Sequence, residues 1–336
     1  MKLRLQSFVP CLLLCITGVS LAEPKPPEIM PAVRCSQPEA KDQDDLCFWE
    51  HPSKPAASRV IVSDKEANRL FVYGLDGKLQ QSIPVKHPGN IDSRRGFLLA
   101  GKPIDIVAVA GRAAHRVYIF QVDEAGQLTR IDDGKIATAD NYGGALFRSS
   151  QTGQFYFIST GLSGKVEQFV LSDNGQGKIA GKRVRDWKCR GICEGAFGDD
   201  EAGKLYIADE NHGVWMLGGE PNEPAPGGLI IPLGKHGLKG DVEGLTMHRT
   251  DAKRGYLIVS NQGSDNFKVY RRESPGEYVG TFTIRGVKGT DGLDLCQSPL
   301  GSAFPGGVFG CHSDEAHPRP IVLSSWQEIL KQLPGK

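Results

Sequence analysis

Short runs of apolar and β-branched residues recur along the chain at nearly constant spacing, and each run ends in small or polar residues. The six runs are RVIVSDK (59–65), DIVAVAGR (105–112), QFYFISTGL (154–162), KLYIADEN (204–211), YLIVSNQG (256–263) and GVFGCHSDE (307–315). Aligned on Ser63, Ala110, Thr160, Ala208, Ser260 and Cys311, they lie 47, 50, 48, 52 and 51 residues apart. Several runs precede a second strand-like run and a hairpin signal, whereas helical periodicity is confined to 326–333.

A period near 50 residues with several short strands per unit is typical of a β-propeller, whose small antiparallel sheets pack around a central channel. The sequence therefore predicts an all-β, six-bladed β-propeller over 44–336, preceded by a signal peptide (1–22) and an N-terminal segment (23–43). The alternative is a β-sandwich with coincidental strand spacing. If the runs are the inner strands of the blades, the residues after them converge at one end of the channel. These residues include Lys65, Arg112, Glu210 and Gln262.

The first 22 residues read MKLRLQSFVPCLLLCITGVSLA. A short basic start, an apolar run too short to span a bilayer and small residues before Glu23 are typical of a cleaved secretory signal. We therefore expect a secreted or periplasmic protein that has no membrane contact after signal cleavage. The alternative is an uncleaved membrane anchor.

The chain has eight cysteines, of which Cys11 and Cys15 leave with the signal. An even number of cysteines in an exported protein favours disulfides, and sequence proximity favours the pairs 35–47, 189–193 and 296–311. Zinc is the alternative, but only Cys189 and Cys193 are close in sequence and no histidine lies at a matching spacing.

Composition and charge exclude some functions. Glycine makes up 42 of 336 residues, roughly twice the usual proportion, which suits many tight turns. The 40 Lys and Arg residues nearly balance the 39 Asp and Glu residues, and this balance argues against a nucleic-acid binder held by a general basic field. The sequence has neither a glycine-rich phosphate loop nor the G-x-S-x-G motif of a nucleophilic serine.

Acidic residues cluster in short turns that the repeat places at blade ends. The turns are DQDD (42–45), CEG (193–195), GDD (198–200), DVEG (241–244) and TDGLD (290–294). Converging carboxylates either raise their pKa values or bind a hard cation, and Ca²⁺ is the natural candidate outside a cell. The glycines in these turns would let the backbone bend sharply, so that several oxygens face one ion. For any single turn, the alternative is a solvated acid.

Basic residues follow the same geometry, because Lys65 and Arg112 end two runs and Arg94 lies in NIDSRRGF. Beside a carboxylate group that holds a cation, Arg or Lys suits an anionic ligand such as phosphate. Acids, a cation and Arg together indicate phosphoryl hydrolysis. His212 and His312 fall just beyond two runs, and we interpret the other histidines as surface or turn residues.

Segments along nearly the whole mature chain resemble the successive signature motifs of the β-propeller phytases. They include DDLCFWEHP, VSDKEANRLFVYGLDGK, NIDSRRGFLLAGKPIDIVAVAGR, CEGAFGDDEAGKLYIADENHGVW, GDVEGLTM and TDGLDL. The resemblance implies a 3-phytase-type, calcium-dependent phosphomonoesterase that hydrolyses phytate, bound as its calcium complex, to lower inositol phosphates. The calcium ligands that it implies are Asp44, Asp45, Glu194, Asp241, Glu243 and Asp291.

The resemblance also implies that Lys65, Arg112 and Tyr142 contact the substrate and act in catalysis, and we add Arg94 as a further substrate contact. Glu210 would orient or activate water, or protonate the leaving oxygen. The expected protein is a monomer that binds this small-molecule substrate and no nucleic acid.

Several positions depart from the family pattern. Leu46 replaces a proline, and Glu66 and Leu162 replace lysines, with only Lys165 close enough to compensate. Segment 312–315 lacks the usual calcium ligands, so we expect one structural calcium site to be missing and a Cys296–Cys311 disulfide to replace its stabilisation. Because the lost lysines would weaken phytate binding, a non-catalytic propeller that binds calcium and a phosphorylated ligand or protein partner is the main alternative. A propeller lactonase or esterase is a further alternative, but it would need an acid-and-histidine arrangement.

Overall fold

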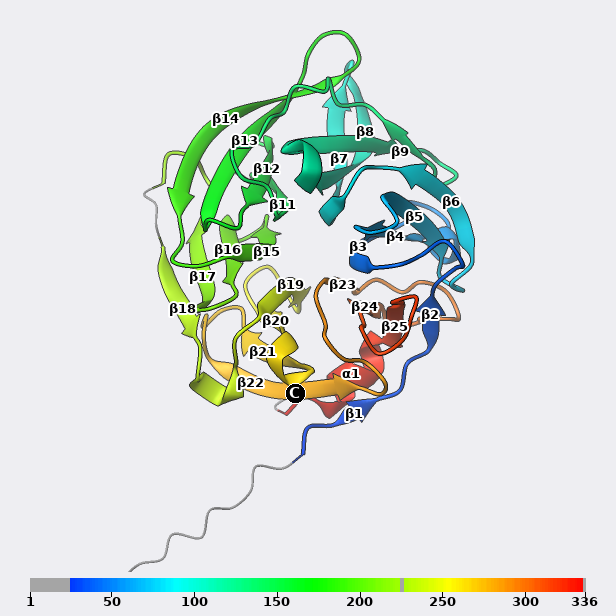
Figure 1. The fold of residues 1–336 in the computed structure, drawn as a ribbon, viewed down its shortest axis with the longest axis vertical. Coiled ribbons are helices and arrows are strands. Elements are labelled where there is room, and N and C mark those ends of the chain that lie inside the picture. The colour runs from blue at the N-terminus through cyan, green and yellow to red at the C-terminus, as the bar shows by residue number, and fades with distance from the viewer. Residues whose placement is uncertain (1–24, 224–226, 335–336) are drawn as a thin grey trace, which may run out of the picture.

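The computed structural model describes residues 25–223 and 227–334, and the expected signal peptide with Cys11 and Cys15 lies outside them. In this part of the chain, six β-sheets form a ring around a central channel (Figure 1). The predicted six-bladed β-propeller is therefore confirmed. Helix α1 (Trp326–Gln332) confirms the expected C-terminal helix. None of the helices in the described ranges is long and apolar enough to cross a membrane.

Within each blade, strands that are consecutive in the chain pair antiparallel from the channel outwards, and two strands from the start of the chain are added to blades 5 and 6. Blade 1 contains β3 (Gln43–Trp49), β4 (Arg59–Asp64), β5 (Arg69–Gly74) and β6 (Leu79–Pro84). Blade 2 contains β7 (Pro88–Leu99), β8 (Lys102–Gly111), β9 (Arg116–Val122) and β10 (Leu128–Arg130). Blade 3 contains β11 (Gly143–Arg148), β12 (Phe155–Thr160), β13 (Lys165–Asp173) and β14 (Ile179–Lys188).

Blade 4 contains β15 (Cys193–Asp199), β16 (Lys204–Asp209), β17 (Gly213–Gly218) and β18 (Gly228–Pro232). Blade 5 contains β19 (Val242–Arg249), β20 (Gly255–Asn261), β21 (Asn266–Arg271) and β22 (Tyr278–Ile284). Blade 6 contains β23 (Leu293–Cys296), β24 (Val308–His312) and β25 (Ile321–Ser325). Short 3₁₀ turns span Pro55–Ala57, Arg112–Ala114, Lys235–Gly237 and Gln262–Ser264.

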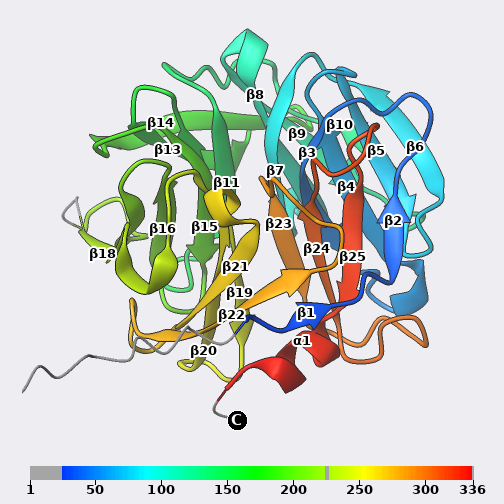
Figure 2. The same ribbon diagram turned by 60° about the horizontal axis from the view of Figure 1, so that its bottom comes forward.

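The start of the chain closes the ring. Strand β2 (Val33–Cys35) pairs antiparallel with β25 and becomes the outermost strand of blade 6. Strand β1 (Glu28–Ile29) pairs in parallel with β22 of blade 5 (Figure 2). Segment 23–43, which the sequence set apart from the propeller, thus contributes strands to two blades.

The six apolar runs are the second strands of the blades and not the innermost ones. Strands β4, β8, β12, β16, β20 and β24 occupy them, whereas the innermost strands of all six blades line the channel cavity. The expectation that the runs are inner strands is therefore wrong. Neighbouring strands are antiparallel, so the end of each second strand still lies beside the start of the innermost strand. Residues that follow the runs therefore meet residues that begin the innermost strands.

The second strands are continuously apolar because both of their faces are buried between blades. In β4, Val60 and Val62 pack in a cluster shared with blade 6, while Ile61 packs in a cluster shared with blade 2. Every residue of β4 after Arg59 is buried. Burial on both faces removes the alternation of a half-exposed strand, so these strands are the ones that the sequence pattern reveals.

The expected disulfides are not formed, because the six described cysteines are all free and buried. Cys35 lies in the core cluster between blades 6 and 1, whereas Cys47 points into the cluster on the other side of the blade 1 sheet. Cys296 and Cys311 likewise lie on opposite faces of blade 6. Only Cys189 and Cys193 share one cluster, and a hydrogen bond between their thiols raises the pKa of Cys193.

Candidate active site at the channel mouth

Irregular pairing at the start of three innermost strands presents acidic residues at one end of the channel. The register shifts between Gln43 and Asp45 in β3, between Cys193 and Ala196 in β15, and between Val242 and Leu245 in β19. A bulge changes the direction of the side chains within it. The acids inside or beside these three bulges are Asp44, Glu194 and Glu243.

The glycine after each of three acids allows neighbouring blades to approach closely. A Cβ atom on Gly195 would lie 2.2 Å from the carbonyl oxygen of Glu243, and one on Gly244 would lie 2.7 Å from the carbonyl oxygen of Asp291. A Cβ atom on Gly292 would lie 2.5 Å from the Cα atom of Asp45. The φ angles of these glycines are outside the left-handed region, so the expected sharp bend is not their role.

Five carboxylates gather at this mouth from four blades. The carboxylate oxygens of Glu194, Glu210 and Glu243 lie within 4.8 Å of one another. Asp44 and Asp291 join the group through Lys65, whose Nζ lies 2.6 Å from Asp44 Oδ1 and 3.7 Å from Asp291 Oδ2. Asp44, Glu194 and Glu243 are each less than 10 % exposed.

Basic and aromatic side chains lie within the same group. The guanidinium of Arg112 donates a hydrogen bond to Glu194 and lies 3.7 Å from Asp44 Oδ2. Its Nε donates to the carbonyl oxygen of Tyr142 at 2.7 Å, and its Cζ lies 3.9 Å from the centre of the Tyr142 ring. Lys65, Arg112 and Tyr142 therefore lie beside the acids, as the sequence analysis expected.

Burial and mutual repulsion perturb these carboxyl groups. Burial raises the pKa of Glu210 to about 7, with the charge of Asp241 adding to the effect, and raises that of Asp291 to about 6. Burial also raises the pKa of Glu194 and Glu243 well above the usual range. Burial alone would raise the pKa of Asp44 too, but Arg112 and Lys65 together lower it. Binding of a cation by these carboxylates would therefore release protons to the solvent.

The donor atoms of this group fit a hard divalent cation. Among the described residues, Asp44 Oδ2, Glu243 Oε2 and Asn90 Oδ1 are buried and have no hydrogen-bond partner. Buried oxygens without a partner are costly unless a cation or water satisfies them. The clustered side chains Glu194, Glu210 and Glu243 offer only oxygen, which Ca²⁺ prefers.

Two expected site residues lie apart from the acids, and a third, Asp241, lies at their exposed edge. Asp241 is exposed beside Glu210, to whose carbonyl oxygen its backbone N–H donates at 3.0 Å. Asp45 points into the channel, where it accepts from Ile91 N at 3.0 Å. Arg94 also lies in the channel, paired with Asp92 at 2.8 Å and Asp200 at 2.9 Å.

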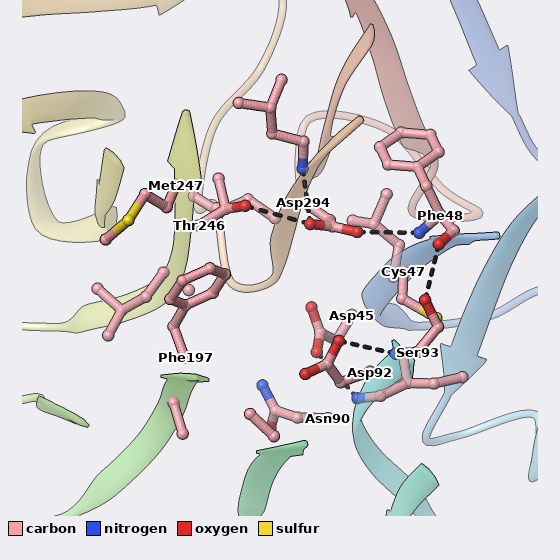
Figure 3. A pocket seen from close by; sticks show the side chains of 18 of the residues that line it. Asp45, Cys47, Phe48, Asn90, Asp92, Ser93, Phe197, Thr246, Met247 and Asp294 are labelled. Atoms are coloured by element: carbon pink, nitrogen blue, oxygen red, sulfur yellow. Dashed lines mark hydrogen bonds between the residues drawn. The ribbon is translucent and has the colours of Figure 1, made fainter. Parts of the chain in front are cut away.

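The channel below the mouth has an acidic lining of its own. Its cavity of about 360 Å³ is lined by the innermost strands of all six blades. Figure 3 shows the carboxylates of Asp45, Asp92 and Asp294 directed into this cavity. Asp294 accepts hydrogen bonds from Phe48 N at 2.9 Å and Thr246 Oγ1 at 3.1 Å. Asp45 and Arg94 thus belong to the channel rather than to the mouth.

Sequence reasoning missed an ion-pair network at the blade 6 side of the mouth. Arg319 pairs with Asp42 at 2.5 Å and with Asp314 at 2.7 Å, and Lys65 Nζ lies 3.4 Å from Asp42. These pairs, and not a Cys296–Cys311 disulfide, connect segment 312–315 to blade 1. The DQDD turn pointed to Asp42, but no sequence signal marked Arg319.

Comparisons with known proteins agree with this architecture. The family model described as Phytase matches residues 28–330. A protein named 3-phytase from Bacillus subtilis (strain 168) is 33% identical over 309 residues, which cover 86% of this chain and 81% of that protein.

Solved structures with low sequence identity show the same fold. Regucalcin, a calcium-binding protein from Agrobacterium tumefaciens strain C58, has a TM-score of 0.56 at 12% identity over 89% of this chain and 97% of that chain. BBS1N, solved in complex with ARL6DN, has a TM-score of 0.52 at 9% identity over 85% of this chain and 79% of that chain. These two structures are similar to the chain in fold alone, whereas the family match and the 33% identical relative show that the chain belongs to a family. The chain belongs to the phytase family, with its six-bladed β-propeller carrying the clustered acids at one mouth of the channel.

Proposed function

We propose that this protein is an exported, calcium-dependent phytase that releases phosphate from phytate. The observation that carries the proposal is the convergence of five carboxylates with Lys65 and Arg112 at one channel mouth, in a chain similar to a protein named 3-phytase. The basic signal-like segment 1–22 supports export.

The residues that would hold calcium are the clustered acids Asp44, Glu194, Glu243 and Asp291. When bound, calcium would neutralise substrate phosphate and lower the pKa of a coordinated water. In the structure, Lys65 and Arg112 are paired with Asp44 and Glu194. If a bound cation neutralised the charge of Asp44 and Glu194, both pairs would be weaker. The Lys65 ammonium and the Arg112 guanidinium would then be free to bind phosphate oxygens.

Glu210 would move the proton. Its carboxyl is partly buried next to Glu194 and Glu243, and its pKa is raised to about 7. Near neutral pH it is present in both protonation states, so it can accept a proton from the attacking water or donate one to the leaving inositol oxygen. Glu210 directly follows the second strand of blade 4, and its carboxyl is close enough to Arg112, which would hold the phosphate, for the Arg112 charge to act on it.

A non-catalytic propeller that binds calcium and a phosphorylated ligand is the second candidate. It is favoured by the rim of the mouth, where the resemblance implies lysines but the chain has Glu66 and Leu162. Glu66 is exposed, and the Leu162 side chain is 54 % exposed. Lys165 lies 3.5 Å from Asp186, so part of its charge is already neutralised.

The decisive experiment measures phosphate release from phytate near neutral pH with calcium and then with a chelator. Calcium-dependent release supports the enzyme, and its loss in Lys65→Met, compared with the exposed control Lys78→Met, supports the site. A folded protein that binds calcium but releases no phosphate would instead establish the binding protein. N-terminal sequencing of the exported protein tests whether processing leaves Glu23 as the first residue.

A further inference from the structure

One position recurs in every blade and lies directly before the residue that reaches the channel mouth. It is the last residue of the second strand, or in blade 3 the residue that follows that strand, and we name it the anchor position. Its occupants are Asp64, Gly111, Gly161, Asp209, Asn261 and His312. The residues that follow include Lys65, Arg112 and Glu210, so the anchor position is one residue away from the site itself.

In blade 4 the anchor residue Asp209 binds the segment that leads into Glu194. Its Oδ2 accepts hydrogen bonds from the backbone N–H groups of Arg190 at 3.2 Å and Gly191 at 3.0 Å. Its Oδ1 lies 2.8 Å from His212 Nδ1. The carboxylate thus connects the segment before Glu194 to the hairpin that carries Glu210.

The same contact recurs in three other blades with different side chains. Asp64 accepts from Lys41 N at 2.8 Å and Asp42 N at 3.1 Å, just before Asp44. Asn261 Oδ1 accepts from Lys239 N at 2.9 Å, ahead of Glu243.

In blade 6, Nδ1 of His312 accepts from Asp291 N at 3.2 Å. The side chains of all four polar anchors are fully buried. None of the four is therefore positioned to contact a substrate directly.

The distribution of polar anchors follows the distribution of site acids. The four blades with a polar anchor are the ones that supply Asp44, Glu194, Glu243 and Asp291 from the start of the innermost strand. Blades 2 and 3 have Gly111 and Gly161 at the anchor position, and their innermost strands begin with PGN and GGA. If these hydrogen bonds served only to stabilise the fold, we would expect them in blades 2 and 3 as well.

We propose that Asp64, Asp209, Asn261 and His312 are positioning residues that hold the four acid-bearing segments in the geometry required for cation binding. This inference rests on the proposed function of the same site. Clustered carboxylates repel one another, and the segments that carry them would move outwards if nothing held them. An acceptor buried beneath each segment opposes that movement through hydrogen bonds to its backbone.

Asp209 offers the sharpest test. We compare Asp209→Ala and the conservative Asp209→Asn with Asp132→Ala, which removes a buried carboxylate that accepts from Ile119 N at 3.1 Å and Gly134 N at 2.9 Å at the outer edge of blade 2. The readouts are calcium affinity by titration calorimetry, hydrogen exchange of residues 189–194, and kcat and KM for phytate.

We expect Asp209→Ala to weaken calcium binding by about tenfold or more, as loss of a residue that supports metal ligands commonly does. Exchange in 189–194 should rise and kcat should fall, with Asp209→Asn intermediate and Asp132→Ala close to wild type in all three. Should Asp209→Ala not fold, Asp209→Asn gives the same readouts, and Asn261→Ala gives calcium affinity, kinetics and the exchange of the Lys239 amide that Asn261 binds.

The inference is overturned if both folded anchor variants have the same calcium affinity and the same hydrogen exchange as Asp132→Ala. Failure of the proposed function is distinguishable, because the wild type would then release no phosphate, whether or not it binds calcium. In that case unchanged exchange in 189–194 still refutes the anchoring by Asp209, and raised exchange still supports it.

Discussion

Replacing Gly195 with alanine should push blades 4 and 5 apart at the active site. The added Cβ would lie 2.2 Å from the carbonyl oxygen of Glu243, whereas ordinary contacts begin near 3.4 Å. The two strands must therefore separate by more than 1 Å. Moving away from Glu243 is also restricted, because Ala208 Cβ lies 3.2 Å from the same position.

The expected cost follows from overpacking between two backbones. Such substitutions cost about 1–3 kcal/mol of unfolding free energy, and contact with backbone on one side and a methyl group on the other places Gly195→Ala near the upper end. Because Glu194 and Glu243 flank this contact, calcium affinity should fall together with stability.

Guanidinium denaturation with calcium and with chelator measures both effects. The control is Gly228→Ala in β18 of the same blade, where a Cβ meets no atom of the described residues within 4 Å. That control should be neutral or more stable by about 0.5–1 kcal/mol, because glycine weakens a strand relative to alanine. The added stability that calcium gives to the wild type should shrink in Gly195→Ala and persist in Gly228→Ala.

The reasoning is refuted if Gly195→Ala matches Gly228→Ala in stability and in its response to calcium. If Gly195→Ala loses the same stability with and without calcium, the packing argument stands. The claim that this contact shapes the cation site is then wrong.

Three further predictions concern pH, substrate and thiols. Burial in the channel raises the pKa of Asp294 from 3.8 to about 6, so ionisation is less favourable in the folded state. The unfolding free energy of the metal-free protein should therefore fall by up to about 3 kcal/mol on account of Asp294 as pH rises from 3.8 through 6. Asp294→Asn should remove this contribution in urea titrations. Leu162→Lys should lower the KM for phytate severalfold without a matching change in kcat, and an unchanged KM would mean that the rim does not contact substrate. Because all six described cysteines are free, alkylation of the unfolded, unreduced protein should modify all six, and fewer modified thiols would contradict this.

The sequence revealed the second strands of the blades, because burial between neighbouring sheets makes both of their faces apolar. It did not reveal the innermost strands, because segments such as CEGAFGD and VEGLTMHR line a polar channel and contain glycines that serve close packing. Their irregular starts gave no periodic signal, although they carry the acids.

Residue motifs identified the acids at the mouth but not what supports them. Asp209 at the end of an apolar run has the same sequence pattern as a solvated turn acid, and only the fold brings Arg190 and Gly191 onto it. The disulfide expectation was wrong for a related reason. Proximity in sequence does not show that Cys296 and Cys311 lie on opposite faces of one sheet.

The closure of the ring by β2 gives the site a particular place in folding. Val33 pairs with Leu323, so a strand that is synthesised before blade 1 joins the last blade to be completed. The seam between blades 6 and 1 runs through the mouth, where Lys65 of blade 1 approaches Asp291 of blade 6. A nascent chain that ends before blade 6 lacks both Asp291 and the strand pairing that closes the ring, so the mouth is completed only when the ring closes.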